Sequence, residues 1–487
     1  MDLHNLTLVQ VRGLLDNQQI TSRQLTDYYL KRLEKYDSYI HSCLFIDYAE
    51  ARRVADLADE RLARGERGGV LGIPYIVKDN ILTKGLKTTA GSKMLADYVA
   101  PYDATVISRL KQAGAVLVAK ANLDEFALGS STENSAFGPT HNPYNLSMVP
   151  GGSSGGSAAA LAADFCTFAL GSDTGGSVRH PASLCGVVGY RPSYGAISRH
   201  GLVAMASSLD AIGILAHSAT DVATIMGVIA GPDKYDATAS LVLEAPTRVS
   251  QTINWTNIKI GWPAEYFGPG LDSEVADSLS QIKNLLLDKG ATILPVNLPL
   301  TSYGVSAYTV INMAEVSSNL ARFDGLRYGH QTGGSNLLET YLNNRGNGFG
   351  AEAKRRIMLG TYFLSAGEGG SYYKKAQIVR AMISREFKEI FTQVDYLFTP
   401  TTPTAAFPLG AKVNDPLSLY LEDSLLTPAS LAHLPAVSIP IGWTSANLPI
   451  GGQIIGKRRD DYKVLTLAQA IQDIIDLPSQ SLTWETN

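Results

Sequence analysis

Two short segments rich in glycine and serine lie close together in the chain. The first reads Gly-Gly-Ser-Ser-Gly-Gly-Ser at 151–157, and the second reads Gly-Ser-Asp-Thr-Gly-Gly-Ser-Val-Arg at 171–179. The apolar stretch between them is broken only by a charged residue, Asp164. Glycine permits positive φ and lets backbone N–H groups approach a ligand closely. The two loops therefore predict one functional centre rather than two flexible linkers.

The serines of these loops would lie beside free backbone N–H groups. A hydroxyl nucleophile next to such donors is the arrangement that acyl transfer needs, provided that a base lies within hydrogen-bond reach. A candidate base is Lys78, which ends the apolar run Ile-Pro-Tyr-Ile-Val-Lys at 73–78. A lysine there is either a surface residue whose stem packs along apolar surface or a buried amine with a lowered pKa.

Length and composition limit the classes of protein to which this chain can belong. A length of 487 residues allows up to about three domains, but no low-complexity linker or strong repeat divides the chain, so we expect one large domain. The net charge of −4 gives no overall basic field for nucleic acid. The three cysteines form no C-x-x-C pair, which suits a reducing compartment. No histidine pair has metal-ligand spacing, and no apolar run approaches the ~18 residues of a membrane span.

Helical and strand-like patterns alternate along the chain, which favours an α/β fold around a mixed or mostly parallel sheet. Helical spacing is found at 6–36, with a break near 16–19, and at 47–65, 104–114 and 272–290. Strand-like runs are found at 73–80, 115–120, 258–261, 292–296, 396–399 and 436–439. The asparagine- and glycine-rich segment 334–350 is expected to be an exposed, mobile loop.

Two other interpretations of the glycine-serine loops fit poorly. A phosphate-binding loop would need Gly-Lys-Ser/Thr or Gly-x-Gly-x-x-Gly, and neither pattern is present here. A nucleophile elbow fits Gly-x-Ser-x-Gly around Ser154, but that elbow needs a strand immediately before it. The preceding residues, 142–150, have the composition of a loop.

Both loops and Lys78 together resemble the amidase signature family. The resemblance implies an α/β fold with a large mixed sheet covered by helices on both faces. It implies a single amidase domain over 1–487, with a helical N-terminal region at 1–65, a signature core at 66–230, and the rest of the sheet and the substrate-pocket elements at 231–487. It also implies a catalytic Ser–cisSer–Lys triad formed by the residues that match the family pattern, Ser177, Ser153 and Lys78.

The resemblance assigns a role to each triad residue. Ser177 matches the nucleophile, Lys78 the base and Ser153 the bridging serine, which can donate and accept a hydrogen bond at once. The backbone N–H groups from Thr174 through Gly175 and Gly176 to Ser177 would form the oxyanion hole. Two further residues of the second loop, Asp173 and Arg179, would hold that loop in place.

Within the family, the chain is most similar to the A subunits of glutamyl-tRNA(Gln) amidotransferases. The similarity lies largely outside the signature, in the runs at 122–138, 189–215, 317–329, 355–361 and 372–380. It implies hydrolysis of glutamine and delivery of ammonia to a B subunit, which amidates Glu-tRNA(Gln) with ATP and Mg²⁺ and makes most tRNA contacts, while a small C subunit clamps the pair. It implies no cofactor or metal in this chain, no membrane contact and a cytoplasmic location.

Glutamine is a zwitterion, so its pocket needs a cation and an anion. By the resemblance, Arg356 or its neighbour Arg355 would bind the α-carboxylate, Asp423 would bind the α-ammonium, and Tyr308 would add a hydroxyl. The chain departs from the family pattern at His180, where glutamine is usual, in Leu-Val-Ala-Met-Ala at 202–206, and at 368–371.

Two rival functions remain open from the sequence. A stand-alone amidase for a small or aromatic amide would share the triad but would not need a charged pair such as Arg356 and Asp423. A non-catalytic scaffold subunit would have no use for a buried lysine or a bridging serine.

Overall fold

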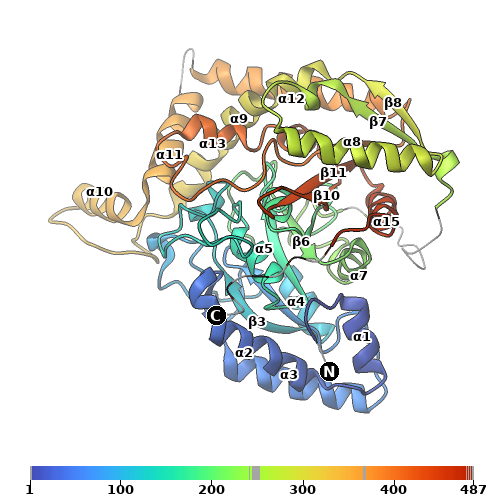
Figure 1. The fold of residues 1–487 in the computed structure, drawn as a ribbon. Coiled ribbons are helices and arrows are strands. Elements are labelled where there is room, and N and C mark those ends of the chain that lie inside the picture. The colour runs from blue at the N-terminus through green and yellow to red at the C-terminus, as the bar shows by residue number, and fades with distance from the viewer. Residues whose placement is uncertain are drawn as a thin grey trace.

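A single mixed sheet runs through the part of the chain that the computed structural model describes (Figure 1), which comprises residues 3–240, 242–243, 253–365, 369–478, 480, 482 and 484. The strands are β1 (Cys43–Ile46), β2 (Pro74–Lys78), β3 (Val116–Ala121), β4 (Phe168–Asp173), β5 (Val188–Arg191), β6 (Ala211–Ala216), β7 (Lys259–Pro263), β8 (Thr292–Val296), β9 (Tyr396–Pro400), β10 (Ala436–Trp443) and β11 (Pro449–Gly456). The segment 368–371, where the sequence departs from the family pattern, begins at a residue outside those that the structure describes.

The strand order in this sheet is β1-β3-β2-β4-β6-β5-β10-β11-β9-β7-β8. β2 lies parallel to β3 and β4, and β7 lies parallel to β8 and β9. The other neighbouring strands pair antiparallel. The mixed sheet predicted from the sequence is therefore confirmed, and the N-terminal region also contributes a strand, β1.

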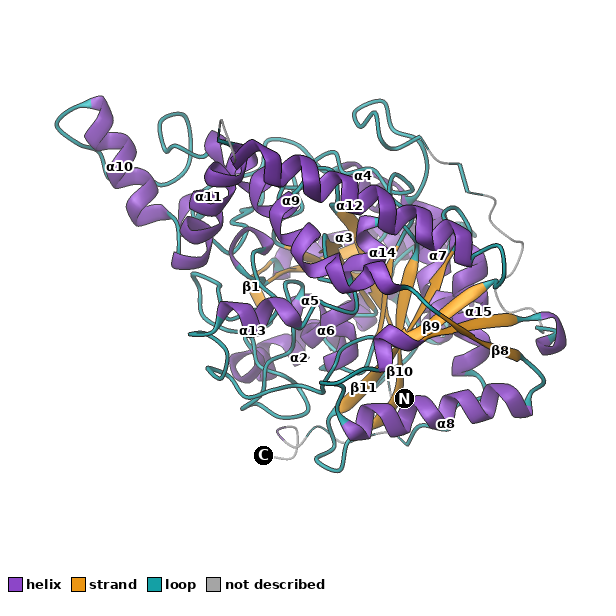
Figure 2. Cartoon of the chain, turned by 90° about the horizontal axis from the view of Figure 1, so that it is seen from above, coloured by secondary structure: helices purple, strands orange, loops and turns teal. Residues whose placement is uncertain are grey.

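Helices cover both faces of the sheet (Figure 2). In the described residues they are α1 (Leu8–Asp16), α2 (Ser22–Ile40), α3 (Tyr48–Ala63), α4 (Thr105–Gln112), α5 (Gly155–Ala162), α6 (Arg179–Leu184), α7 (Ala219–Ile229), α8 (Ser273–Asp288), α9 (Gly304–Asn319), α10 (Leu337–Gly348), α11 (Ala351–Leu364), α12 (Gly369–Ile390), α13 (Pro416–Leu421), α14 (Thr427–Leu431) and α15 (Asp461–Gln472). The predicted break after α1 is present, and Thr21 and Gln24 form a capping box at the start of α2.

Successive side chains of β2 point to opposite faces of the sheet and pack against different helices. Tyr75 and Val77 pack into the cluster that includes α1, α4 and α7. Ile76 packs on the opposite face, in the cluster that includes the alanines of α5. Because side chains alternate between the two faces of a strand, Lys78 is directed to the same face as Ile76, towards the start of α5.

The expectation of a loop at 334–350 is wrong, because this segment contains the helix α10. Asn336 caps it by accepting a hydrogen bond from the Glu339 N–H. Its last turn is anchored where the Asn344 amide donates to two backbone carbonyls, those of Asp324 and Gly325. These contacts offset the low helix propensity of asparagine and glycine. Both views show α10 projecting from the body of the molecule (Figures 1 and 2).

Candidate active site

Three segments meet at the C-terminal ends of the neighbouring strands β2 and β4. β2 and β4 are parallel neighbours, with Tyr75 opposite Phe168, so their C-terminal ends lie side by side. Lys78 is the last residue of β2, and residues 174–178 follow β4 directly. Residues 151–154 lead into the N-terminus of α5, which packs against both strands. The two glycine-serine loops and the lysine therefore meet at one place, as the sequence predicted.

The amine of Lys78 is surrounded by serine hydroxyls. Its Nζ atom is 2.8 Å from Ser153 Oγ, 2.9 Å from Ser154 Oγ and 3.0 Å from Ser172 Oγ. The side chain is fully buried. Burial lowers the pKa of Lys78 to about 7, although carboxylates such as Asp124 partly oppose the shift. A substantial fraction of the amine is therefore neutral near neutral pH and able to accept a proton.

The two serine loops are tied to each other. The peptide bond between Gly152 and Ser153 is cis, as the resemblance implied. The Ser154 N–H donates to the Ser177 carbonyl at 3.1 Å, which fixes the second loop beside the first. Ser177 is only 4% exposed. The structure thus brings Lys78, Ser153 and the backbone of Ser177 into one buried cluster.

In the described residues, the loop at 174–177 contains backbone N–H groups that make no hydrogen bond. Among the described residues, no hydrogen bond is made by the N–H groups of Gly175, Gly176 and Ser177. The Thr174 hydroxyl donates to the buried carboxylate of Asp210 at 2.7 Å, and Asp210 also accepts the Met205 N–H at 3.0 Å. Unpaired donors on a loop that is held rigidly from behind are what an oxyanion hole requires.

A buried ion network supports the same loop. The Asp173 carboxylate accepts hydrogen bonds from Arg179 Nε and Nη2, both at 3.1 Å, and from Arg191 Nη1 at 2.9 Å. Burial alone would raise the pKa of Asp173, but the two guanidinium groups outweigh that effect and hold the pKa well below its usual range. Arg179 also donates to the Gly175 carbonyl at 3.0 Å. The network therefore anchors the loop that carries Ser177.

Replacing Asp173 by asparagine is expected to lower the free energy of unfolding by about 3–5 kcal/mol, because it leaves two buried guanidinium groups without their counter-charge. Denaturant unfolding of the purified protein measures the change. The matched control is Asp56→Asn, which removes an exposed ion pair with Arg23 and is expected to leave the unfolding midpoint unchanged. An effect of Asp173→Asn as small as that of the control would show that the network does not anchor the loop.

A small cavity of about 20 Å³ lies beside the glycine loop. Its lining includes all three residues predicted to bind substrate, which are Tyr308, Arg356 and Asp423. The Tyr308 ring packs on Gly175 so closely that a Cβ there would lie 2.7 Å from it. A Cβ on Gly176 would likewise lie 3.1 Å from Asp423 Oδ1. The charged pocket and the oxyanion loop are therefore in direct contact.

The structure distinguishes the two candidate arginines. Arg356 is 6% exposed and lines the cavity, whereas the Arg355 side chain is 43% exposed on the outer side of α11. Arg356 Nε donates to Glu352 at 2.7 Å and its Nη1 donates to Asn312 at 3.3 Å. The guanidinium also lies over the ring of Tyr420, 5.1 Å from its centre. Of the two arginines, only Arg356 therefore lines the cavity.

Asp423 is the anion of the same pocket. Its Oδ1 atom is buried and accepts no hydrogen bond from the residues that the structure describes. Burial raises the pKa of Asp423 to about 6. A buried carboxylate oxygen without a donor is costly unless a ligand supplies one. Asp423 is therefore suited to bind a cationic group.

Comparison with known proteins agrees with this geometry. A family model described as amidase matches residues 24–465. The chain belongs to the amidase family. The A subunits of glutamyl-tRNA(Gln) amidotransferase from Roseiflexus sp. strain RS-1 and Bacillus velezensis strain FZB42 are similar to it, at 49% and 46% identity, over 97% of both chains in the first case and 98% of both in the second.

The fold agrees with a solved amidase of the same group. The crystal structure of the A subunit of glutamyl-tRNA(Gln) amidotransferase from Thermotoga maritima matches with a TM-score of 0.82 and 40% identity, over 99% of this chain and 97% of that chain. The nucleophile-elbow interpretation of Ser154 fails on geometry, because a loop rather than a strand precedes it.

Sequence reasoning missed several residues of this amidase site. Ser172 contacts the base, Asp210 holds Thr174, and Glu352 and Asn312 orient Arg356. Ser172 lies within the second glycine-serine segment but had no assigned role. The other three lie in ordinary helix or loop sequence, where nothing in the local pattern marks them.

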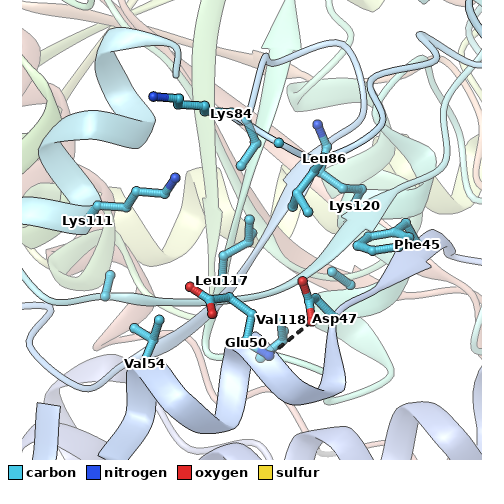
Figure 3. A pocket seen from close by; sticks show the side chains of 14 residues that line it. Phe45, Asp47, Glu50, Val54, Lys84, Leu86, Lys111, Leu117, Val118 and Lys120 are labelled. Atoms are coloured by element: carbon cyan, nitrogen blue, oxygen red, sulfur yellow. Dashed lines mark hydrogen bonds between the residues drawn. The ribbon is translucent and has the colours of Figure 1, made fainter. Parts of the chain in front are cut away.

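A further cavity, of about 260 Å³, lies between α3, β3 and the loop 83–86 (Figure 3). Its walls include Phe45, Leu117 and charged residues such as Glu50 and Lys111, but none of the predicted catalytic or substrate-binding residues. The three predicted substrate-binding residues line the smaller cavity instead.

Two features are absent from the described residues. They contain no group of three or more histidine, cysteine, aspartate or glutamate side chains that could hold a metal ion. None of their helices has the length and hydropathy needed to cross a bilayer.

Proposed function

We propose that this chain is the glutamine-hydrolysing subunit of a tRNA-dependent amidotransferase. The observation that carries the proposal is the position of Lys78, buried and 2.8 Å from Ser153, next to the loop of Ser177. The adjoining pocket holds a buried cation, Arg356, and a buried anion, Asp423. Glutamine carries the complementary charges and an amide that this machinery can cleave.

The proposed reaction begins with proton transfer. Ser177 Oγ attacks the side-chain carbonyl carbon of glutamine while its proton passes to Ser153 and the proton of Ser153 passes to the neutral Lys78 amine. The carbonyl oxygen becomes negative and is stabilised by the N–H groups of 174–177. The proton then returns through Ser153 to the leaving nitrogen, ammonia departs and a γ-glutamyl ester remains on Ser177. Water hydrolyses that ester by the same relay and releases glutamate.

The charged pocket would hold the other end of glutamine. Arg356 would bind the α-carboxylate, because a guanidinium offers paired donors. Asp423 would bind the α-ammonium and Tyr308 would contribute its hydroxyl. This chain itself would need no cofactor.

The partners follow from the amidotransferases that the chain resembles. A B subunit would use ATP and Mg²⁺ to activate Glu-tRNA(Gln), would make most of the tRNA contacts and would consume the ammonia. A C subunit would complete a heterotrimer in the cytoplasm. Delivery of ammonia to a partner explains why a chain of net charge −4 serves a tRNA-dependent reaction.

The test compares glutamine with butyramide, which is the same amide without the α-ammonium and α-carboxylate. Asp423→Asn is expected to raise KM for glutamine by about 10- to 100-fold, because it removes a charge-assisted hydrogen bond, and to leave butyramide hydrolysis unchanged. In the wild type, KM for glutamine is expected to rise as the pH falls below about 6, since Asp423 is then protonated and neutral. Initial rates of ammonia release between pH 5 and 8 give KM for each substrate and its dependence on pH.

A stand-alone amidase would give the opposite results in this test. An enzyme that prefers butyramide to glutamine, and whose KM for glutamine is unaffected by Asp423→Asn and by pH near 6, would not be a glutaminase. Its charged pocket would then have another purpose, and the proposed function would be wrong.

A further inference from the structure

His180 lies between the catalytic loops and the substrate pocket. It belongs to α6, three residues after Ser177, and its side chain is fully buried. Its backbone N–H donates to the Gly176 carbonyl at 2.8 Å. Neither the triad nor the proposed glutamine contacts use this imidazole.

One ring nitrogen of His180 contacts the loop of the bridging serine. The Gly152 N–H donates to His180 Nδ1 at 3.4 Å. The ring also packs on Gly151, where a Cβ would lie only 2.8 Å from Nδ1. Because Nδ1 accepts a hydrogen bond, the ring carries its hydrogen on Nε2. His180 therefore supports the residues that immediately precede Ser153.

The other ring nitrogen faces Glu422, which precedes the pocket residue Asp423. Nε2 is 4.0 Å from Glu422 Oε2 and makes no hydrogen bond among the described residues. Glu422 is 4% exposed, and its other oxygen accepts a hydrogen bond from Lys412. The next residue along the chain is Asp423, whose unpaired carboxylate oxygen lines the cavity. His180 therefore spans the gap between the Ser153 loop and the turn that carries Asp423.

We propose that His180 is a positioning residue that couples the loop of the bridging serine to the turn that holds the pocket anion. Nδ1 fixes Gly152, and Nε2–H faces Glu422 and keeps the 422–423 turn in register with the loop. Ser153 and Asp423 would act on opposite ends of one glutamine molecule. A single rigid ring that contacts the supports of both sets the distance between them, and misplacement by about 1 Å can cost 100-fold in rate. This inference rests on the proposed glutaminase function.

Two substitutions separate the two contacts. His180→Asn places an amide oxygen where Nδ1 lies, so it keeps the acceptor for Gly152 but does not reach Glu422. His180→Gln carries its amide further out, near the position of Nε2, and so keeps a donor facing Glu422. His180→Leu keeps neither contact.

Steady-state kinetics with glutamine and butyramide distinguish the variants. His180→Asn is expected to raise KM for glutamine about 10-fold, because the turn that carries Asp423 loses the ring that faces Glu422 and is no longer held in place, with kcat and butyramide hydrolysis unchanged. His180→Gln is expected to keep KM and to lower kcat only about threefold, since the Gly152 contact is long and weak. His180→Leu is expected to impair both KM and kcat.

The matched control is His217→Leu. His217 also has a buried Nε2 without a hydrogen bond, but it follows Ala216, at the end of β6 far from Asp173. This variant is expected to show wild-type kinetics. Thermal unfolding of each variant shows whether it folds, and the Asn and Gln variants decide the question if the Leu variant does not.

Two results would overturn the inference. One is a change of the same size in His180→Asn for glutamine and butyramide, which would indicate a general structural effect. The other is a wild-type KM in both His180→Asn and His180→Leu, which would show that the ring does not position the pocket. These kinetics are measured on the chain assembled with its B and C partners. Failure of that wild-type complex to hydrolyse glutamine would instead reject the proposed function, so the two failures are distinguishable.

Discussion

Replacing Ser177 by alanine is expected to abolish glutamine-dependent amidation in the assembled complex and to leave amidation with free ammonia intact. The first effect follows because no acyl-enzyme can form, and loss of a serine nucleophile lowers kcat by about 10⁶-fold in a well-studied protease. The second follows because ammonia added to the solution bypasses this chain. Amidation of Glu-tRNA is measured with each nitrogen source in turn.

The matched control is Ser157→Ala. Ser157 is a buried serine of α5 whose hydroxyl donates to the Leu170 carbonyl at 3.0 Å, outside the triad. This variant is expected to keep both activities. Loss of ammonia-dependent amidation in Ser177→Ala would contradict the division of labour between subunits, and retained glutamine hydrolysis would show that Ser177 is not the nucleophile.

Replacing Lys78 by methionine is expected to lower kcat for glutamine by about 10⁴-fold or more, because the serine relay then lacks its base. Methionine has a similar length and no charge, so it fits the buried site. The double variant Lys78→Met/Ser177→Ala should be no slower than Ser177→Ala alone, since residues that act as one unit have non-additive effects. Single-turnover ammonia release provides the rates.

The pH dependence of the wild type tests the same base. Burial lowers the pKa of Lys78 to about 7, so the neutral amine is the minor form below that pH. We expect kcat to fall about tenfold per pH unit below about 7 and to level off above it. A flat profile between pH 5 and 8, or a Lys78→Met variant with near-normal kcat, would show that another group accepts the proton.

The strand that carries Lys78 could be predicted from local sequence. The run 73–78 has the composition of a buried strand, and the structure confirms it as β2 with Lys78 at its end. The two glycine-serine segments also stand out in the sequence, but the strand β4 was not predicted, because its residues 171–173 belong to the second of these segments. The parallel pairing of β2 and β4, which only the structure shows, brings these segments together.

The error at α10 has a different origin. Its asparagines and glycines lower helix propensity, and its leucines at 337, 338 and 342 are exposed rather than placed on a core-facing stripe. The helix forms because of a cap and of long-range contacts, such as the one between Asn344 and residues 324–325. Contacts with distant segments cannot be inferred from local periodicity.

The supports of the site were missed for the same reason. Asp210 becomes important only because β6 pairs with β4 and brings it beside Thr174. Glu352 precedes Arg356 by one helical turn, but only the fold shows that α11 turns this pair, and not Arg355, towards the cavity. The candidate site residues were thus predictable from the motif, whereas the residues that support them depend on tertiary structure.

The most direct test of the account is ammonia release from glutamine by the purified chain, alone and with candidate B and C subunits from the same organism. We predict that hydrolysis requires the partners, rises when ATP and Glu-tRNA(Gln) are added, and is absent in Ser177→Ala. A chain that is inert towards glutamine in every combination, but cleaves simple amides on its own, would contradict the account and would be a stand-alone amidase.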